Sequence, residues 1–584
     1  MVAFDLLKIR HWIFTLAFAT IHACSTPTTT DTLLEGDSVL ADKQAPVILS
    51  PSATGGRALN QTVKLVWAAK IPARYYEIHV ASDSAFQSPI SGSPFKVTAP
   101  ATELSVALPA AVRYYWRVRT NYNATGVFSS GYFDAMDSAV YVYCPGSFAT
   151  CDDTGQAGNK SHPFRTVGAA LAYARTATVS DIIVATRESG ATYTDTLIVI
   201  PGVNLKGGYT STFLEADRNV SSNQTKVSYN GTVLFALNVT QATNVQGFNM
   251  IATGTTSNVA LVSGSDSNFT VQNNRIETSV SQPGPSHGLL VQNSGTAPAN
   301  GPIFTNNVIL SGNVTTPSSA TAAVKIENSA LTLRGNYIRS GTMVQGITNF
   351  PSLSTGLWLV MSNVLVVNNV IVANIITSAG ADSWSIGTYH NPANGGTFTN
   401  NTSVTLSANG NAYAFAMNGG GAGAKPIVTN NIFFNASGGR VFYEWNSTDN
   451  PASLHNNAFV GGGVVYRDNG ATDRADADIN TAGLTNQGAA GTVSGNLRPA
   501  AACIPFVNYA GDDYRLQQNS CTANEWRDLR YGGLDTSLSN CGTGSASCGS
   551  VTTDLNAVTR TAVNTGSSPL TNAAGYSMGA YEQD

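Results

Sequence analysis

The chain has 584 residues, of which only 11% are charged, and its formal net charge is −4. An average soluble protein carries about 25% charged residues, so this deficit argues against coiled coils and charged disordered tails. The chain has 31 Lys and Arg residues and 35 Asp and Glu residues, and this balance provides no basic surface for nucleic acid. After the N-terminus, no apolar run reaches the roughly 18 residues of a membrane-spanning helix. We therefore expect a large, charge-poor, exported protein rich in β-structure.

The N-terminus has the layout of a secretory signal peptide, because a basic start precedes a short apolar stretch, residues 12–21. An Ile-His-Ala-Cys segment then ends at Cys24 and resembles a bacterial lipobox, with His22 in place of the usual small residue. The resemblance implies a signal peptide over residues 1–23 and a lipidated, Thr-rich tether over residues 24–44. It also implies a lipid anchor in the cell envelope, at the outer membrane or cell surface. Ordinary signal cleavage that leaves Cys24 free is the alternative.

The seven cysteines support the lipid anchor, because six remain once Cys24 is lipidated. An even number in an exported chain favours disulfides. Zinc binding is the competing interpretation, but no CxxC spacing or neighbouring His pair is present, and we expect no metal. The simplest of the 15 connectivities pairs neighbours along the chain: Cys144 with Cys151, Cys503 with Cys521, and Cys541 with Cys548.

Residues 45–137 show the alternation of a small β-sandwich, with turn signals between short strand-like runs. In the run 113–119, Tyr114, Trp116 and Val118 share one face, which we expect in the core. The runs are 63–67, 75–80 and 113–119. The early Trp67 and the late Tyr-Trp-Arg-Val-Arg run resemble a fibronectin type III domain, a spacer or binding module.

The next segment predicts a capped solenoid. A small amphipathic helix is expected over residues 169–174, followed by a strand-like run, 181–185, and a Gly-Gly-Tyr turn that ends at Tyr209. This order resembles the opening of right-handed parallel β-helix proteins of the pectin-lyase-like, DUF1565-type group. The resemblance implies that the helix covers the first coil, which otherwise exposes unpaired strand edges and an apolar lumen.

An internal repeat predicts the same architecture independently. A unit of the form apolar-x-Asn/Gly-Asn-x-apolar recurs every 26 to 33 residues, a period typical of solenoids, and its strand-like pattern lacks a helical period. Asn tolerates the left-handed geometry of a sharp corner, and stacked Asn side chains can form hydrogen-bonded ladders. The second Asn of each unit falls at Asn274, Asn307, Asn336, Asn369, Asn401, Asn431 and Asn457.

The expected fold is therefore all-β. An N-terminal fibronectin type III-like β-sandwich precedes a right-handed parallel β-helix solenoid with a short N-terminal capping helix, over residues 138–500. Residues 501–584 are expected to be the disulfide-stapled C-terminal end of the β-helix. Segments 553–560 and 576–582 resemble the closing pattern of these helices, with small departures at Ser577 and Met578.

Carboxylates are too scarce in the coils to predict catalysis. Glycoside hydrolysis needs two carboxylates about 5–10 Å apart, and a calcium-dependent lyase needs an acidic cluster, because Ca²⁺ prefers six to eight oxygen ligands. Glu277 and Glu327 lie 50 residues apart, which is not a whole number of coils, so no aligned pair is expected. No cofactor is expected, and Ca²⁺ only if the chain is a lyase. The acids between residues 231 and 460 are Asp266, Glu277, Glu327, Asp382, Glu444 and Asp449.

The best local constellation lies in residues 382–390, which combine a carboxylate, a Trp, a Tyr and a His. Three residues are weak candidates for catalysis and three for sugar contact. The alternative is that these residues have no functional role and only pack a loop, with His390 exposed. The catalytic candidates are Asp382, His390 and Glu444, and the binding candidates are Trp384, Tyr389 and Trp445.

Three functions remain open. The first is a lipid-anchored, non-catalytic surface scaffold, expected to be monomeric, that binds a glycan or a host or cell-surface partner through the flank of the solenoid. The second is a polysaccharide lyase or hydrolase with a site on that flank. The third is a purely structural envelope protein. The low charge favours the first, although a fold alone does not determine function.

Overall fold

The computed structural model describes most residues between 45 and 522. The expected signal peptide, Cys24, the tether, and the segments 553–560 and 576–582 lie outside the described residues. The gaps are 53–56, 59–61, 71–72, 111, 122–126, 136–137, 146–152, 154–157, 221–223, 316–318, 344–351, 377–382, 392–394, 408–410, 419–424, 447–448, 482–483, 485–492, 501–502 and 517–520.

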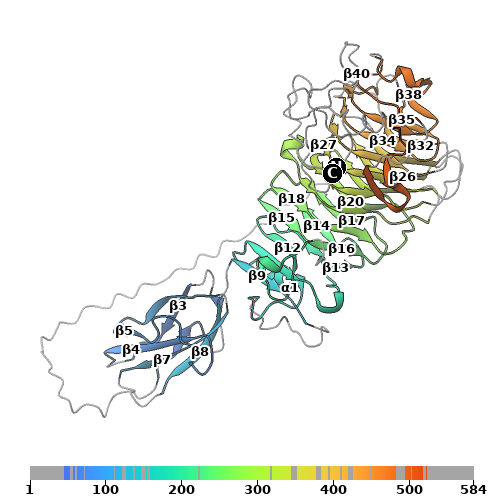
Figure 1. The fold of residues 1–584 in the computed structure, drawn as a ribbon. Helices are drawn as coiled ribbons and strands as arrows, with labels where there is room; N and C mark the ends of the chain where they lie inside the picture. The colour runs from blue at the N-terminus through green and yellow to red at the C-terminus, as the bar shows by residue number, and fades with distance from the viewer. Residues whose placement is uncertain are drawn as a thin grey trace, which may run out of the picture.

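Two small sheets enclose one hydrophobic cluster in the N-terminal part (Figure 1). Along β7, buried side chains alternate with partly exposed ones, as predicted, and Trp67 and Trp116 are buried in the core. The first sheet contains β1 (Ile48–Ser50), β3 (Thr62–Trp67) and β6 (Glu103–Ala107). The second contains β2 (Arg57–Ala58), β8 (Ser129–Ala135), β7 (Arg113–Thr120), β4 (Tyr75–Ala81) and β5 (Phe95–Thr98).

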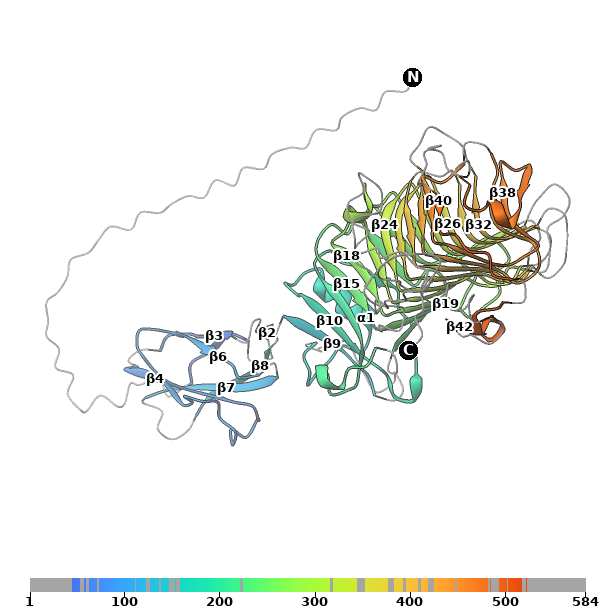
Figure 2. The same cartoon turned by 45° about the horizontal axis from the view of Figure 1, so that its top comes forward.

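A parallel β-helix follows, and Figure 2 shows its coils stacked one on another. Each coil passes in turn through three sheets, here named sheets 1, 2 and 3. Sheet 1 contains β9 (Ala139–Val142), β10 (Asp181–Ala185), β12 (Asn204–Tyr209), β15 (Thr243–Gln246), β18 (Phe269–Gln272), β21 (Ile303–Thr305), β24 (Ala330–Arg334), β27 (Asn363–Val367), β30 (Thr397–Thr399), β33 (Ile427–Thr429), β36 (Ser453–His455) and β40 (Val493–Ser494).

Sheets 2 and 3 complete the coils, and their strands are parallel except for the last strand of sheet 3. Sheet 2 contains β13 (Thr225–Tyr229), β16 (Phe248–Ala252), β19 (Arg275–Thr278), β22 (Val308–Leu310), β25 (Tyr337–Arg339), β28 (Val370–Ala373), β31 (Thr402–Thr405), β34 (Ile432–Asn435) and β37 (Ala458–Gly461). Sheet 3 contains β11 (Leu197–Ile198), β14 (Leu234–Leu237), β17 (Asn258–Ser263), β20 (Ser286–Gln292), β23 (Ala320–Glu327), β26 (Ser352–Val360), β29 (Ser383–His390), β32 (Ala412–Met417), β35 (Arg440–Glu444), β38 (Val464–Asp468) and β39 (Thr472–Arg474). This architecture confirms the predicted all-β fold class with its right-handed parallel β-helix.

The helix α1 (Val167–Ala174) contributes Val167 and Leu171 to the hydrophobic cluster that fills the lumen, as expected of a capping helix. Its first turn is held by side chains that accept backbone hydrogen bonds. Thr166 accepts from Ala169 at 3.1 Å, and Asp195 accepts from Val167 at 3.1 Å. These contacts satisfy N–H groups that a helix end otherwise leaves without partners.

The predicted asparagine ladder forms at the corner between sheets 1 and 2. In the coil at Asn336, the backbone N–H and the side-chain amide both donate to Asn369 Oδ1 at 2.9 Å. The residue before each ladder position has a φ between 51° and 67°, so the first residue of each pair makes the turn and the second makes the ladder. Asn496 extends the ladder by one coil, and it accepts from Asn457 at 3.0 Å. Each predicted position takes part: Asn274, Asn307, Asn336, Asn369, Asn401, Asn431 and Asn457.

A second ladder, which the sequence pattern did not predict, lies at the corner between sheets 3 and 1. Backbone N–H groups of one coil donate to serine Oγ atoms of the next, at 3.1 to 3.3 Å. The lumen between the ladders is apolar and becomes aromatic toward the C-terminus, where Phe415 stacks on Phe442 at 4.9 Å. The serines are Ser265, Ser294, Ser329 and Ser362.

A hairpin of β41 (Phe506–Asn508) and β42 (Asp513–Leu516) packs on the outer face of sheet 2. Phe506 lies 5.3 Å from Phe434 of β34, between ring centroids. The predicted Cys503–Cys521 disulfide closes the hairpin and is confirmed. Cys144 is also disulfide-bonded. Its expected partner Cys151, and the expected Cys541–Cys548 pair, lie outside the described residues.

Candidate functional site

The predicted site residues lie on β29 and at the end of β35, neighbouring parts of sheet 3, but on opposite faces. Because strand side chains alternate between faces, Tyr389 and His390 point in different directions. His390 occupies an interior position between Leu359 and Met417 of the adjacent strands, and the same interior column continues to Glu444. Both His390 and Glu444 are 0% exposed. Asp382 lies outside the described residues.

The expectation of an exposed His390 in a loop is therefore wrong, because His390 is a buried residue of strand β29. Its Nε2 lies 3.2 Å from the carbonyl oxygen of Ser362, the last serine of the ladder, and its ring lies 6.0 Å from Phe398. Burial lowers the pKa of His390 to about 4, so the imidazole is neutral at physiological pH. The contact with Ser362, at the end of the serine ladder, gives the buried His390 side chain a polar partner.

Glu444 lies in a buried group of acids at the C-terminal end of the lumen. Burial raises its pKa well above the usual value, and Asp468 and Asp449 raise it further, whereas a hydrogen bond from Tyr466 opposes the change. Arg474 donates to Asp468 at 2.9 Å. Glu444 is thus enclosed in the interior, where burial favours its uncharged form and a polymeric substrate has no access.

The three predicted binding residues, in contrast, come together on the outer face of sheet 3. Trp445 lies 5.5 Å from Trp384 and 5.8 Å from Tyr389, between ring centroids. We call the whole cluster the aromatic platform. It belongs to a hydrophobic cluster separate from the lumen, and four of its side chains are partly exposed, whereas Tyr389 and Tyr413 are buried beneath them. Its members are Trp358, Trp384, Tyr389, Tyr413, Tyr443 and Trp445.

The rings of the platform form one continuous contact network. Trp358 stacks on Tyr389 at 6.2 Å with an interplanar angle of 27°. Tyr443 lies 4.4 Å from Trp445 and 4.6 Å from Tyr413. Such offset and edge-on pairs contribute roughly 0.5–1.5 kcal/mol each beyond the burial of their surface. The partly exposed rings are thereby held in fixed orientations.

Sequence reasoning missed three platform residues, Trp358, Tyr413 and Tyr443. The period of the asparagine ladder would have found two of them, because parallel in-register strands stack residues one coil apart. The positions from Lys325 to Tyr443 are spaced 27 to 33 residues apart. They belong to an outward row, here called the outer column, with members Ile198, Phe235, Leu261, Leu290, Lys325, Trp358, Tyr389, Ala416 and Tyr443.

Ion pairs border the platform at both ends. Lys325 Nζ lies 2.7 Å from Glu327 and 4.4 Å from the centroid of the Trp358 ring. At the other end, Asp473 pairs with Arg467 at 3.0 Å and with Arg440 at 3.4 Å. Each bordering cation therefore has a carboxylate partner.

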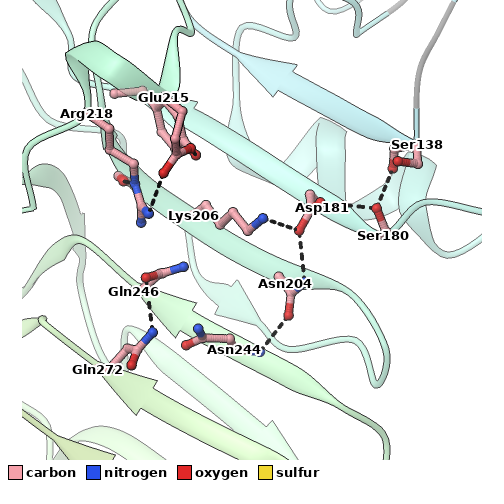
Figure 3. A network of polar contacts seen from close by, with 12 residues as sticks. Ser138, Ser180, Asp181, Asn204, Lys206, Glu215, Arg218, Asn244, Gln246 and Gln272 are labelled. Atoms are coloured by element: carbon pink, nitrogen blue, oxygen red, sulfur yellow. Dashed lines mark hydrogen bonds and ion pairs between the residues drawn. The ribbon is translucent and has the colours of Figure 1, made fainter.

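The outer face of sheet 1 is polar instead, as Figure 3 shows for its first coils. Asp181 accepts from Asn204 at 2.9 Å and pairs with Lys206 at 2.8 Å, and these contacts lower its pKa against the effect of burial. Gln272 donates to Gln246 of the preceding coil at 3.2 Å. These hydrogen bonds and ion pairs join successive coils, which stabilises the stack.

Glu277 and Glu327 do not come together as a pair of acids. Glu277 lies on sheet 2 and pairs with Arg275 at 2.7 Å, whereas Glu327 lies on sheet 3, so the two carboxylates are on different sheets. Within the described part of the chain, no three His, Cys, Asp or Glu side chains are grouped to hold a metal ion. The described residues also contain no helix of the length and hydropathy that membrane crossing requires.

We compared the chain with protein-family models, with curated proteins and with solved structures. None of the three comparisons gives a match.

Proposed function

We propose that the protein is a non-catalytic scaffold, anchored by lipid at Cys24 to the bacterial cell envelope, that binds a glycan through the aromatic platform. The observation that carries the proposal is the cluster of six aromatic side chains on the outer face of sheet 3. Aromatic faces pack against the apolar C–H faces of sugar rings, and preorganised rings lose little entropy on binding.

Polar groups beside the platform suit sugar hydroxyls. Asn391 donates to the Tyr389 hydroxyl at 2.8 Å, and Asn418 donates to the same oxygen at 3.4 Å. Binding sites of this kind combine an apolar floor with a few placed polar groups. The platform and its two amide side chains have this composition.

The burial of the catalytic candidates favours binding over turnover. His390 and Glu444 are fully buried in the lumen, where burial lowers the pKa of His390 to about 4 and raises the pKa of Glu444 well above its usual value. A glycosidase needs two carboxyl groups that reach the scissile bond. The platform supplies rings at the surface and no such pair among its own members.

Glycan-array screening of the purified chain, with calorimetry on each hit, tests the proposal. Trp445→Ala is expected to weaken binding about tenfold or more, as for a central aromatic contact. Tyr229→Ala is the matched control, because Tyr229 is an exposed aromatic residue, 43% exposed, on sheet 2. Absence of binding to every glycan would overturn the proposal. Turnover of pectin, alginate or glycosaminoglycan that vanishes in Asp382→Ala or Glu444→Ala would replace it with a lyase or hydrolase.

The anchor has a separate test. Cys24→Ala is expected to move the protein from the membrane fraction to the soluble exported fraction. Unchanged retention in the membrane fraction would contradict the lipid anchor without affecting the platform.

A further inference from the structure

The central strands under the platform carry no charged side chain. The sequences of β26, β29 and β32 are SLSTGLWLV, SWSIGTYH and AYAFAM, which contain no Asp, Glu, Lys or Arg. Their one histidine, His390, is buried and neutral. The described side chains of these three strands therefore offer a ligand rings, hydroxyls and aliphatic groups but no charged group.

Each cation at the borders already pairs with a carboxylate, and Arg467 and Arg440 share a single one. Lys325 would have to leave Glu327 to bind a sugar carboxylate, and Arg467 and Arg440 share Asp473. A carboxylated ligand would also approach Glu327 and Asp473, which repel it, and it would lose hydration on the rings without a free cation in return. The charge distribution thus disfavours uronic acid chains.

The outer column gives the direction of the ligand. The column crosses the strands, and its part from Trp358 to Tyr443 covers three strand spacings, about 14 Å at about 4.8 Å each. Trp358 and Tyr443 are partly exposed, and Tyr389 and Ala416 are buried between them. Beyond Lys325 the column continues with the buried Leu290 and the partly exposed Leu261 and Phe235, and it reaches Ile198, which is 42% exposed. Figure 1 shows the strands of sheet 3 following one another along the solenoid.

We infer that the ligand of the platform is an uncharged, extended polysaccharide chain that lies across the strands of sheet 3, along the outer column. This inference rests on the proposed glycan-binding function and specifies its ligand class and orientation. The platform binds the central sugars, and the exposed part of the column from Ile198 to Leu261 contacts a longer chain.

Calorimetry of the full chain with cellohexaose, xylohexaose and a hexagalacturonate of equal length tests the ligand class. At least one uncharged hexasaccharide is expected to bind tenfold or more tightly than hexagalacturonate. Glu327→Gln releases Lys325 and is expected to raise affinity for hexagalacturonate at least threefold, while affinity for the uncharged chain stays within twofold. Glu277→Gln is the matched control, because it releases Arg275 on sheet 2 and is expected to change neither.

Chain length tests the orientation. A twelve-residue oligomer of the bound sugar is expected to bind more tightly than the hexasaccharide, and Leu261→Ser is expected to remove that advantage. Equal affinity for both lengths would overturn the orientation. Tighter binding of hexagalacturonate that is lost in Trp445→Ala would overturn the ligand class and leave the proposed function intact. No binding of any glycan would overturn the proposed function itself.

Discussion

Removal of one asparagine from the middle of the ladder is expected to destabilise the solenoid far more than removal of its neighbour. Asn369 is 0% exposed. Its side-chain amide donates to Leu333, Val367 and Asn401, each at 3.0 Å. Its oxygen accepts both the backbone N–H and the side-chain amide of Asn336 at 2.9 Å.

Asn369→Ala leaves both of these Asn336 donors without their acceptor in a buried environment. Each unsatisfied buried donor costs about 1–3 kcal/mol, and the lost donor bonds of Asn369 add to this. We therefore expect a loss of about 3–5 kcal/mol in the free energy of unfolding. Asn401 Oδ1 keeps the backbone N–H of Asn369 as a donor, so the damage falls mainly on the N-terminal side of the substitution.

Asn368→Gly is the matched control. Asn368 has a φ of 56°, and Gly335 holds the equivalent corner in the preceding coil with a φ of 61°. Glycine adopts this geometry without strain, so we expect a change within about 1 kcal/mol. Urea unfolding of the intact chain, followed by hydrogen exchange of peptides that cover Asn336 and Asn401, measures both variants. Equal stability of the two variants would refute the ladder as the main polar support of this corner.

Three further outcomes follow from buried groups. The pKa of His390 is lowered from 6.5 to about 4, so its contribution to stability is present above pH 6.5 and about 3 kcal/mol is lost as pH falls through 6.5 toward 4. Thermal unfolding of His390→Met between pH 4 and 7 should lack that loss, and an unchanged profile would contradict it. Burial raises the pKa of Glu444, so the contribution of this side chain to stability falls as pH rises above about 4.5. The stability of Glu444→Gln relative to wild type should therefore increase with pH. A difference in the free energy of unfolding that stays constant with pH would count against this. Replacement of Cys503 and Cys521 by Ser opens a loop with a sequence separation of 18 and should cost about 3 kcal/mol, with faster exchange in β41 and β42; unaltered exchange there would show that packing alone holds the hairpin.

Much of the solenoid could be predicted from residue order alone. The spacing of the Asn pairs gives the coil period. Because buried amides need hydrogen-bond partners, Asn side chains that are buried one coil apart are expected to bond to each other as a ladder. Asn369 illustrates this, since both its turn-making neighbour and its place in the repeat are visible in the sequence. The serine ladder was not predicted, because serine is common throughout this chain and Ser362 has no paired motif to mark it.

The face on which each site residue lies could not be predicted locally. His390 and Tyr389 are adjacent, yet His390 lies in the lumen and Tyr389 belongs to the platform on the outer face, and a shift of one residue in register would exchange them. The residue types of Trp384, Tyr389 and Trp445 suggest sugar contact, but only the stacking of strands β29 and β35 on either side of β32 brings the three together.

The coils, their corners and the low charge of the chain therefore follow from residue order, because they depend on residues within one repeat. Which side chains reach the surface depends on how the coils stack. Stacking places Trp358, from another coil, beside Tyr389 and withdraws Glu444 into the interior. The physical reason is that contacts between coils join residues about 30 positions apart, whose inward or outward direction depends on the register of every strand between them.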